Sequence, residues 1–421
     1  MIKIKKHLAL LLFIGMDFNM KKNYWFLSVI LFLNSCEDNI KNAESSGTKF
    51  SVTFHIGEND RVQDIEQTND RGYIILVNNE SNSPNHTGSY FLLKIDQDGI
   101  QEQILELDTT IYSGYTEVGQ INDGSYIVRG FYQAEDAPYN WDNVLRIDSD
   151  FINQTQNSER ILNGKFTSEG FTSLVGETSI IWNPFTVIRK YYLTKVFWTG
   201  DTLWSNDDLL PELMAMDSNF SIYNGTYPSL IISDMTDDDG CILMGKNSGS
   251  LHLAKINSEG NVEWVKINSN GSYEEASVDG NTFLFDRIEQ TMDGGYIIAG
   301  FNLMKLSSQG EFEWINENPI EVNDIIHTDF DVRQIKDGGY LLGGYYPNND
   351  LENGTPYIIK TDNLGTVVSK IDFTDFLPPI RFETTDDGGY VFSASYDQGN
   401  GDKDVVIIKF DSDGYMLELD N

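Results

Sequence analysis

The chain has 421 residues, 40% of them hydrophobic, which is enough to bury a large core without disulfide bonds. Its formal net charge is −36 at pH 7, with 65 acidic residues against 29 basic ones. Such a chain repels nucleic acid and anionic lipid head groups, so we exclude nucleic acid as a partner and expect membrane contact only through a lipid anchor.

The first 35 residues read as a leader that precedes the folded protein. From Met20 the sequence "MKKNYWFLSVILFLNSC" has two lysines, a short apolar core and a small residue before Cys36. This is the order of a signal peptide, and the core is too short for a transmembrane helix. We therefore predict a signal peptide over residues 1–35, with the true start at Met20.

The stretch Leu33-Asn34-Ser35-Cys36 resembles a bacterial lipobox, although Asn34 is not the usual residue at its position. This resemblance implies that Cys36 is lipidated and that the protein is an outer-membrane lipoprotein of a bacterial cell envelope. Glu37-Asp38 resembles the acidic export tag of surface lipoproteins, which implies exposure at the cell surface. Residues 36–47 then form the lipidated cysteine and a polar tether. The alternative is an ordinary cleaved signal with a chance cysteine.

A first pattern recurs six times after the tether. It reads "DGGYIIAG" from Asp293, "DGGYLLGG" from Asp337 and "DGGYVFSA" from Asp387, with looser copies from Asn69, Asn122 and Asp238. Asp-Gly suits a two-residue type I′ turn, in which glycine takes a positive φ at little cost. The tyrosine and the apolar residues after it suit a strand. Each copy therefore predicts a tight turn that joins two antiparallel strands.

A second pattern follows each copy of the first and reads apolar-apolar-Lys-Ile-Asp-x-x-Gly, in some copies with a Trp beyond it. It begins at Leu92, Val144, Leu253, Leu303, Ile358 and Ile407. It predicts a third strand, a turn and a fourth strand in each of six units. A seventh, degenerate unit is expected between the second and fourth, with a strand, turn and strand over Gly170–Trp182 and another pair over Tyr191–Trp204.

Units of four strands with a period of about 50 residues are typical of a β-propeller. We predict an all-β chain that forms a seven-bladed β-propeller of four-stranded antiparallel blades over residues 48–421. Two β-sandwich domains are the alternative, but sandwiches do not repeat one hairpin pattern in this way. The pairing of "DGGYI" with K-I-D-x-x-G-x-x-x-W resembles repeats of secreted and lipid-anchored β-propellers of Bacteroidetes-type bacteria, and more distantly Asp-box and quinoprotein-like propellers. That resemblance implies the fold and no particular activity.

Two sets of residues are candidates for binding. Long loops after second and fourth strands carry aromatic residues that could contact sugar rings or a protein partner: Tyr132, Tyr139, Trp141, Tyr345 and Tyr346. Alternatively, several of them pack the loops onto the blades. Charged residues alternate with apolar ones along most of the predicted first strands, which line the channel of a propeller, so Arg287, Arg333 and Arg381 could form an anion site near its mouth. The favoured interpretation is that each arginine pairs with a carboxylate of the next blade.

Other chemistry has little support in the sequence. The histidines show no ligand spacing, so we expect no metal site and no cofactor. Cys241 replaces the repeat tyrosine and should be an inert buried thiol. We predict a monomeric, non-catalytic binding or scaffold module for a glycan or an envelope protein. The alternatives are a glycan-active hydrolase or lyase with its site at the channel mouth, and a purely structural envelope component.

Overall fold

The computed structural model describes residues 49–79, 88–107, 114–132, 141–152, 154–161, 164–166, 170–182, 185–197, 201–207, 209, 213, 229–247, 250–267, 285–300, 302–316, 328–346, 354–397 and 402–411. The chain divides into two compact units, Met1–Ser46 and Gly47–Asn421, and all described residues belong to the second unit. Within the described residues, no helix is long and apolar enough to cross a membrane.

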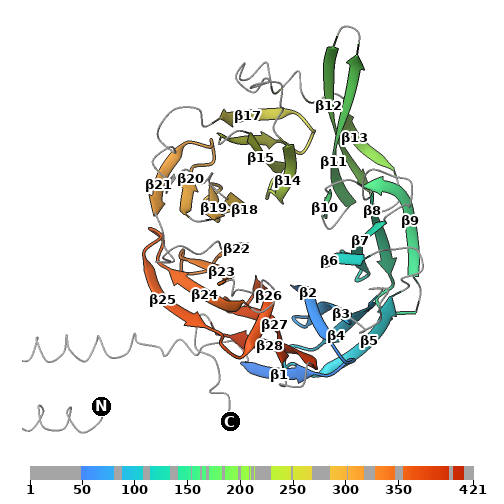
Figure 1. Cartoon of the computed structure of the whole chain (residues 1–421), viewed down its shortest axis with the longest axis vertical. Coiled ribbons are helices and arrows are strands. Elements are labelled where there is room, and N and C mark those ends of the chain that lie inside the picture. Colours follow the sequence, from blue (N-terminus) through green and yellow to red (C-terminus); the bar gives the residue numbers. More distant parts are fainter. Residues whose placement is uncertain are drawn as a thin grey trace, which may run out of the picture. The chain divides into compact units, whose positions relative to one another are not determined.

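Six four-stranded antiparallel sheets each consist of four consecutive strands. Their strands are β2 (Asp60–Gln67), β3 (Tyr73–Asn79), β4 (Ser89–Ile95), β5 (Gln101–Leu107); β6 (Gly114–Gln120), β7 (Tyr126–Tyr132), β8 (Trp141–Ile147), β9 (Gln154–Ile161); β10 (Gly164–Phe166), β11 (Gly170–Trp182), β12 (Phe185–Phe197), β13 (Thr202–Asn206); β14 (Ser229–Met235), β15 (Cys241–Asn247), β16 (Ser250–Ile256), β17 (Val262–Ile267); β18 (Phe285–Gln290), β19 (Tyr296–Gly300), β20 (Leu303–Leu306), β21 (Phe312–Asn316); β22 (Thr328–Gln334), β23 (Tyr340–Tyr346), β24 (Thr355–Thr361) and β25 (Val367–Asp372). The first strand of each sheet faces a common centre and the fourth lies at the periphery, which is the arrangement of a β-propeller (Figure 1).

The prediction of a seven-bladed propeller is wrong, because only six of the sheets in the described residues are blades of four consecutive strands. One further sheet is composite, with the order β1-β28-β27-β26. It joins β26 (Phe376–Thr384), β27 (Tyr390–Asp397) and β28 (Lys403–Phe410) to β1 (Phe50–Phe54) from the other end of the unit. The sequence predicted its fourth strand after Gly414, but β1 pairs with β28 instead, from Phe50 opposite Lys409 to Phe54 opposite Val405. The sheet therefore closes the ring with both ends of the unit.

The degenerate unit also differs from its prediction. Gly170–Trp182 is one continuous strand, β11, and not a strand, turn and strand. It pairs with β12 along its whole length, from Gly170 opposite Phe197 to Trp182 opposite Phe185. β-Branched residues are frequent in both segments and favour extended backbone throughout, so the hairpin runs beyond the reach of β10 and β13. Figure 1 shows it projecting from the ring.

The recurring turn is not the two-residue type I′ turn that the sequence predicted. In the copy around Asp293, the N–H of Gly294 donates to the carbonyl of Thr291 (2.7 Å), and the N–H of Thr291 donates to the carbonyl of Gly295 (2.9 Å). Of the two central glycines, Gly294 alone has a positive φ, of 77°. This pattern is typical of a type I turn followed by a left-handed residue at a bulge. The same position holds Arg71 and Asp239 in other copies, both also with positive φ.

The two sequence patterns meet in space through a buried lysine. Lys305, 3% exposed, donates to Asp293 of the turn (3.1 Å) and to the carbonyl of Leu306 (2.9 Å). Burial raises the pKa of Asp293, but hydrogen bonds from Thr291, Gly295 and Lys305 outweigh it, so the net pKa is lowered. Equivalent pairs are Lys94–Asp70, Lys255–Asp238 and Lys409–Asp387. The lysine of the second pattern thus fixes the turn of the first.

Neighbouring sheets interlock through the peripheral aromatic residue. The ring of Trp264 in β17 contacts Tyr296 of the next sheet edge-on, with the centroids 5.7 Å apart, and its Nε1 donates to the carbonyl of Ser308 (3.1 Å). Trp314 contacts Tyr340 of the next sheet in a tilted arrangement, with the centroids 5.9 Å apart. In the composite sheet β1 supplies Phe50, which contacts Tyr73 at 5.9 Å. At the ring closure, Phe50 therefore takes the place of the tryptophan that contacts the tyrosine of the next sheet elsewhere in the ring.

Glutamines at the ends of first strands make a second link between sheets. The turn N–H of Met292 donates to the side chain of Gln334 (2.6 Å) in the next sheet. The N–H of Asp386 donates to Gln67 (2.8 Å), which joins the composite sheet to β2. Equivalent bonds run from Asn69 to Gln120 and from Asp237 to Gln290. Adjacent first strands are therefore held in a fixed register around the centre.

Candidate functional site

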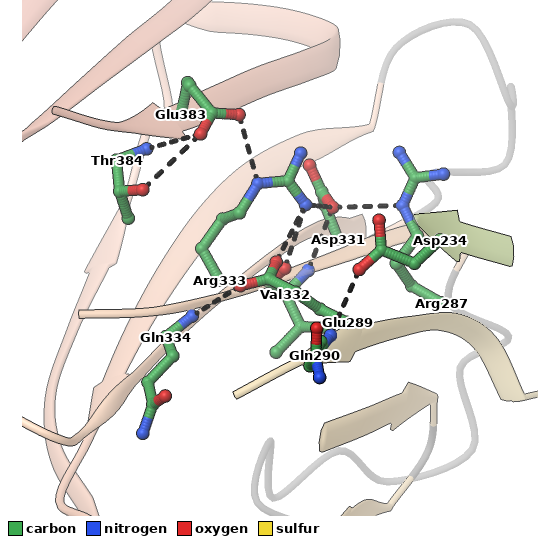
Figure 2. Close-up of polar contacts among 10 residues, drawn as sticks. All are labelled: Asp234, Arg287, Glu289, Gln290, Asp331, Val332, Arg333, Gln334, Glu383 and Thr384. Atoms are coloured by element: carbon green, nitrogen blue, oxygen red, sulfur yellow. Dashed lines mark hydrogen bonds and ion pairs between the residues drawn. The ribbon is translucent and has the colours of Figure 1, made fainter. Parts of the chain in front are cut away.

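A cavity of about 260 Å³ opens between the first strands β14, β18, β22 and β26. The residues that line it are Asp234, Arg287, Ile288, Glu289, Arg333, Glu383 and Thr384. Charged residues alternate with apolar ones along these strands, so every second side chain lies on the same face of the strand. In this way the alternation found in the sequence places both guanidinium groups and three carboxylates around one space (Figure 2).

Arg333 lies at the centre of this group and contacts carboxylates from three strands. Its Nη1 lies 2.8 Å from Asp331 and 3.2 Å from Glu289, and its Nε lies 3.1 Å from Glu383. Nη1 also donates to the carbonyl of Val332 (3.0 Å). Burial opposes the charge, but these carboxylates raise the pKa of Arg333 well above its usual range, so the guanidinium is charged and its Nη1 and Nε are engaged by the protein.

The other two predicted arginines also bond to the following sheet. Arg287 Nε donates to Asp331 (3.2 Å) of β22, as the pairing interpretation predicts. Arg381 Nε instead donates to a backbone carbonyl, that of Gln63 in β2 (2.9 Å). Arg287 and Arg333 line the cavity together, and Arg381 is not among its lining residues. The structure thus brings two of the three predicted channel arginines to one site, each held by a carboxylate.

Glu289 is a buried carboxyl group of the cavity whose pKa is raised. Burial raises the pKa of Glu289 to about 8, helped by Asp234 and Glu383 and opposed by Arg333 and the N–H of Gln334. The backbone N–H groups come from the next sheet: Gln334 donates to Glu289 (3.1 Å) and Gln290 donates to Asp234 (3.1 Å). Glu289 therefore holds a proton at neutral pH more often than an ordinary glutamate.

Two carboxylates on β2 show the same behaviour. Burial, together with Glu117, raises the pKa of Asp64 to about 6. Burial and the nearby Asp64 and Glu383 raise the pKa of Glu66 well above its usual value. Asp64 accepts a hydrogen bond from the N–H of Val118 (2.9 Å) in the next sheet. Several carboxyl groups on the first strands thus resist ionisation because like charges surround them in a dry environment.

We expect this crowding to make stability depend on pH. Because the pKa of folded Glu289 is about 8 against 4.5 in the unfolded chain, the unfolded state releases its proton first, and stability falls as pH rises between those values. In thermal melts from pH 5 to pH 8, the melting temperature of Glu289→Gln should fall less steeply with rising pH than that of the wild type. Glu259→Gln, at an exposed turn, is the control. Parallel curves for wild type and Glu289→Gln would contradict the assignment.

The aromatic residues predicted in the loops do not form one site in the described residues. Tyr139 lies outside the described residues, as do most residues of the long loops predicted to carry binding. Tyr132 ends β7 and Trp141 begins β8, and the two are cross-strand partners at the end of that hairpin. Tyr346 ends β23. Tyr345 is 9% exposed within β23 and opposite Pro356, so it belongs to the buried part of the blade and not to an open loop.

Sequence reasoning recognised the charged first strands but assigned no role to Asp234, Glu289 and Glu383, which line the cavity with the arginines. Their alternation with apolar residues was the available signal. It identifies the side of each first strand that faces the channel, but it does not show which sheets contribute to one cavity. The glutamines that bridge the sheets were also missed, although Gln67, Gln120, Gln290 and Gln334 occupy one repeat position.

Comparisons with known proteins identify the fold. No protein-family model matches the chain, and no curated protein matches it. Among solved structures, prolyl oligopeptidase B from Galerina marginata matches at 10% identity with a TM-score of 0.50, over 85% of this chain and 50% of that one. A protein of unknown function from Dyadobacter fermentans matches at 9% identity and a TM-score of 0.44, over 85% and 97%. A quinoprotein alcohol dehydrogenase-like protein from Bacteroides thetaiotaomicron matches at 12% and 0.41, over 76% and 68%.

This chain spans half the length of the prolyl oligopeptidase, and likeness at such low identity carries no activity with it. The sheets around a common centre and this structural match together identify the chain as a β-propeller.

Proposed function

We propose that this protein is a non-catalytic binding or scaffold module of a bacterial cell envelope, which holds a glycan or protein ligand. One observation carries the non-catalytic part of the proposal: Nη1 and Nε of Arg333 are paired with Asp331, Glu289 and Glu383. A substrate carboxylate, sulfate or phosphate would have to displace these neighbours to bind the same nitrogens, in a cavity lined by three carboxylates and two guanidinium groups. An arginine site for anionic substrates is therefore not supported.

The envelope location rests on the leader. Residues 1–35 and Cys36 lie outside the described residues, and the basic start, apolar core and lipobox-like Leu33–Cys36 support a lipid anchor followed by a short tether. The acidic remainder of the chain would stay clear of the lipid surface. Mass spectrometry of the mature N-terminus tests this: a lipid-modified Cys36 is expected, and an unmodified chain that begins elsewhere contradicts it.

We place ligand binding at the long loops, beginning with the loop between β7 and β8. The cross-strand pair Tyr132 and Trp141 stands where that loop meets the sheet. Aromatic residues next to each other supply flat apolar area at low entropic cost, and each stacked contact is typically worth about 0.5–1.5 kcal/mol beyond its area. A rigid blade that carries variable loops is a frequent design for recognition.

Trp141→Ala should weaken binding of the best glycan found on an array by roughly three- to tenfold, since it removes one stacked contact. The protein should be the chain from residue 37, titrated by calorimetry, with a thermal melt of each variant. Tyr345→Phe, at a buried position of another blade, is the matched control and should bind normally. If Trp141→Ala binds like the wild type but melts several degrees earlier, Trp141 packs the loop and this assignment is wrong.

A glycan-active hydrolase or lyase is the second candidate, and one feature favours it. Glu289 lines the cavity and has a pKa of about 8, so it could hold a proton for a leaving group at neutral pH, as a general acid requires. Under this alternative, Glu289→Gln would abolish turnover of a neutral glycan while leaving its binding intact. Under the binding proposal there is no turnover for the substitution to remove.

A further inference from the structure

Three metal-ligating side chains meet where the ring closes. His55 follows β1, Asp60 begins β2 and Asp404 belongs to β28. One ligand atom from each lies within 4.8 Å of the other two. His55 Nδ1 lies 2.8 Å from Asp404 Oδ1, although the two residues are 349 positions apart in the sequence. Spacing along the chain could not reveal this group, because the fold alone brings its members together.

Asp60 is held rigidly at this point. It is fully buried, and its Oδ2 accepts hydrogen bonds from the N–H groups of Ile56 (2.8 Å) and Gly57 (3.1 Å). Its Oδ1 accepts one from Asn79 Nδ2 (2.8 Å). A carboxylate offers about four acceptor sites, so Oδ1 keeps capacity for one more partner. The hydrogen bonds therefore orient the carboxylate without exhausting it.

Two buried carboxylates lie close together at this point. Asp404 is 3% exposed and pairs with His55, and the fully buried Asp60 lies beside them, in a chain whose net charge is −36. Buried carboxylates are normally paired with a cation or coordinate a metal. Asn59 precedes Asp60 and bridges Lys403, the neighbour of Asp404, and its buried Oδ1 has no hydrogen-bond donor among the described residues. The strand junction therefore holds a further buried oxygen without a hydrogen-bond donor among the described residues.

We propose that His55, Asp60 and Asp404 bind a divalent transition-metal ion of the zinc type. One imidazole nitrogen with two carboxylate oxygens suits Zn²⁺, whereas Ca²⁺ and Mg²⁺ prefer oxygen ligands alone. The His55 side chain is 59% exposed, so it can turn toward the ion and leave a fourth position open to water. The ion would join β1, β2 and β28 and so lock the composite sheet to the sheet that follows it.

The test is a calorimetric titration of ZnCl₂ into the untagged, chelator-treated chain from residue 37, with thermal melts in the presence and absence of zinc. This chain lacks Cys36, and its remaining cysteine, Cys241, is buried. We expect one zinc per chain and a rise of several degrees in melting temperature with zinc. CaCl₂ at the same concentration should have no such effect.

The variants separate this site from adventitious binding. His55→Gln and Asp404→Asn should each lower the zinc affinity at least tenfold and remove the zinc-dependent rise in melting temperature. Glu58→Gln, an exposed carboxylate of the same loop outside the group, should bind zinc like the wild type. His55→Gln is the decisive variant, because an exposed histidine can be replaced without loss of fold. Zinc binding that is absent, or equally strong in His55→Gln, would overturn the proposal.

Discussion

Replacing Phe50 by alanine should destabilise the protein by about 3–5 kcal/mol, the usual loss for a buried phenylalanine. Phe50 is 6% exposed and belongs to a cluster that joins residues of β2–β4, such as Ile75, to residues of β28, such as Ile407. Its ring also contacts Tyr73 at 5.9 Å. The truncation therefore opens a cavity at the place where the two ends of the unit meet.

The loss should also be local. Hydrogen exchange in Phe50→Ala should accelerate first in β1, β2 and β28, because these strands form the closure, while β14–β17 stay protected. Thr53→Ala is the control: Thr53 is an exposed position of the same strand, and its replacement should change stability by less than about 0.5 kcal/mol. Uniform loss of protection around the ring, or an unchanged free energy of unfolding, would show that β1 is not the closing element.

Gly295→Ala should cost about 3 kcal/mol, clearly more than Gly294→Ala, although the two glycines are adjacent in "DGGYIIAG". A Cβ at Gly295 would collide with the carbonyl oxygen of Leu306 and with Nζ of Lys305. It would push the buried ammonium away from Asp293 and Leu306, and overpacking at a site that cannot relax is strongly destabilising. A Cβ at Gly294 would meet only Ser308, at 3.8 Å.

Gly294→Ala should therefore cost about 1 kcal/mol, from its positive φ alone, and Gly294→Val on the order of 1–3 kcal/mol. Chemical denaturation of the alanine pair measures the difference. Other copies of the turn agree with this difference. Arg71 and Asp239 replace the glycine equivalent to Gly294. Ser125 replaces the glycine equivalent to Gly295, in a copy where Arg146 takes the place of the lysine. Equal costs at the two positions would show that the lysine does not require the second glycine.

The repeated residues made most of the fold predictable. Turn glycines, strand tyrosines and the lysine pattern are local signals, so four-stranded units and a propeller followed from them. The composite sheet did not follow, because the pairing of β1 with β28 depends on contacts between the ends of the unit. The long β11–β12 hairpin was missed because the sequence of Gly170–Trp182 does not distinguish one long strand from two short strands joined by a turn.

The candidate site was predictable only in part. The alternation around Arg287 and Arg333 identified the channel face, and the favoured ion pairs to the next sheet are present. The cavity itself depends on four strands that lie far apart in the sequence. The raised pKa of Glu289 depends first on burial and then on carboxylates contributed by two of the other strands. Tyr345 shows the converse error: an aromatic residue near a loop is buried within a strand.

Arg287 and Arg333 are paired with carboxylates of the protein, and we propose that they serve no anionic substrate. Calorimetric titration of N-acetylneuraminic acid into the chain from residue 37, together with a fluorogenic sialoside assay, tests this most directly. We predict no saturable heat and no turnover at neutral pH, because Asp331, Glu289 and Glu383 already engage Arg333. Saturable binding or turnover that is lost in Arg287→Ala or Arg333→Ala would contradict the account and make the channel an active site.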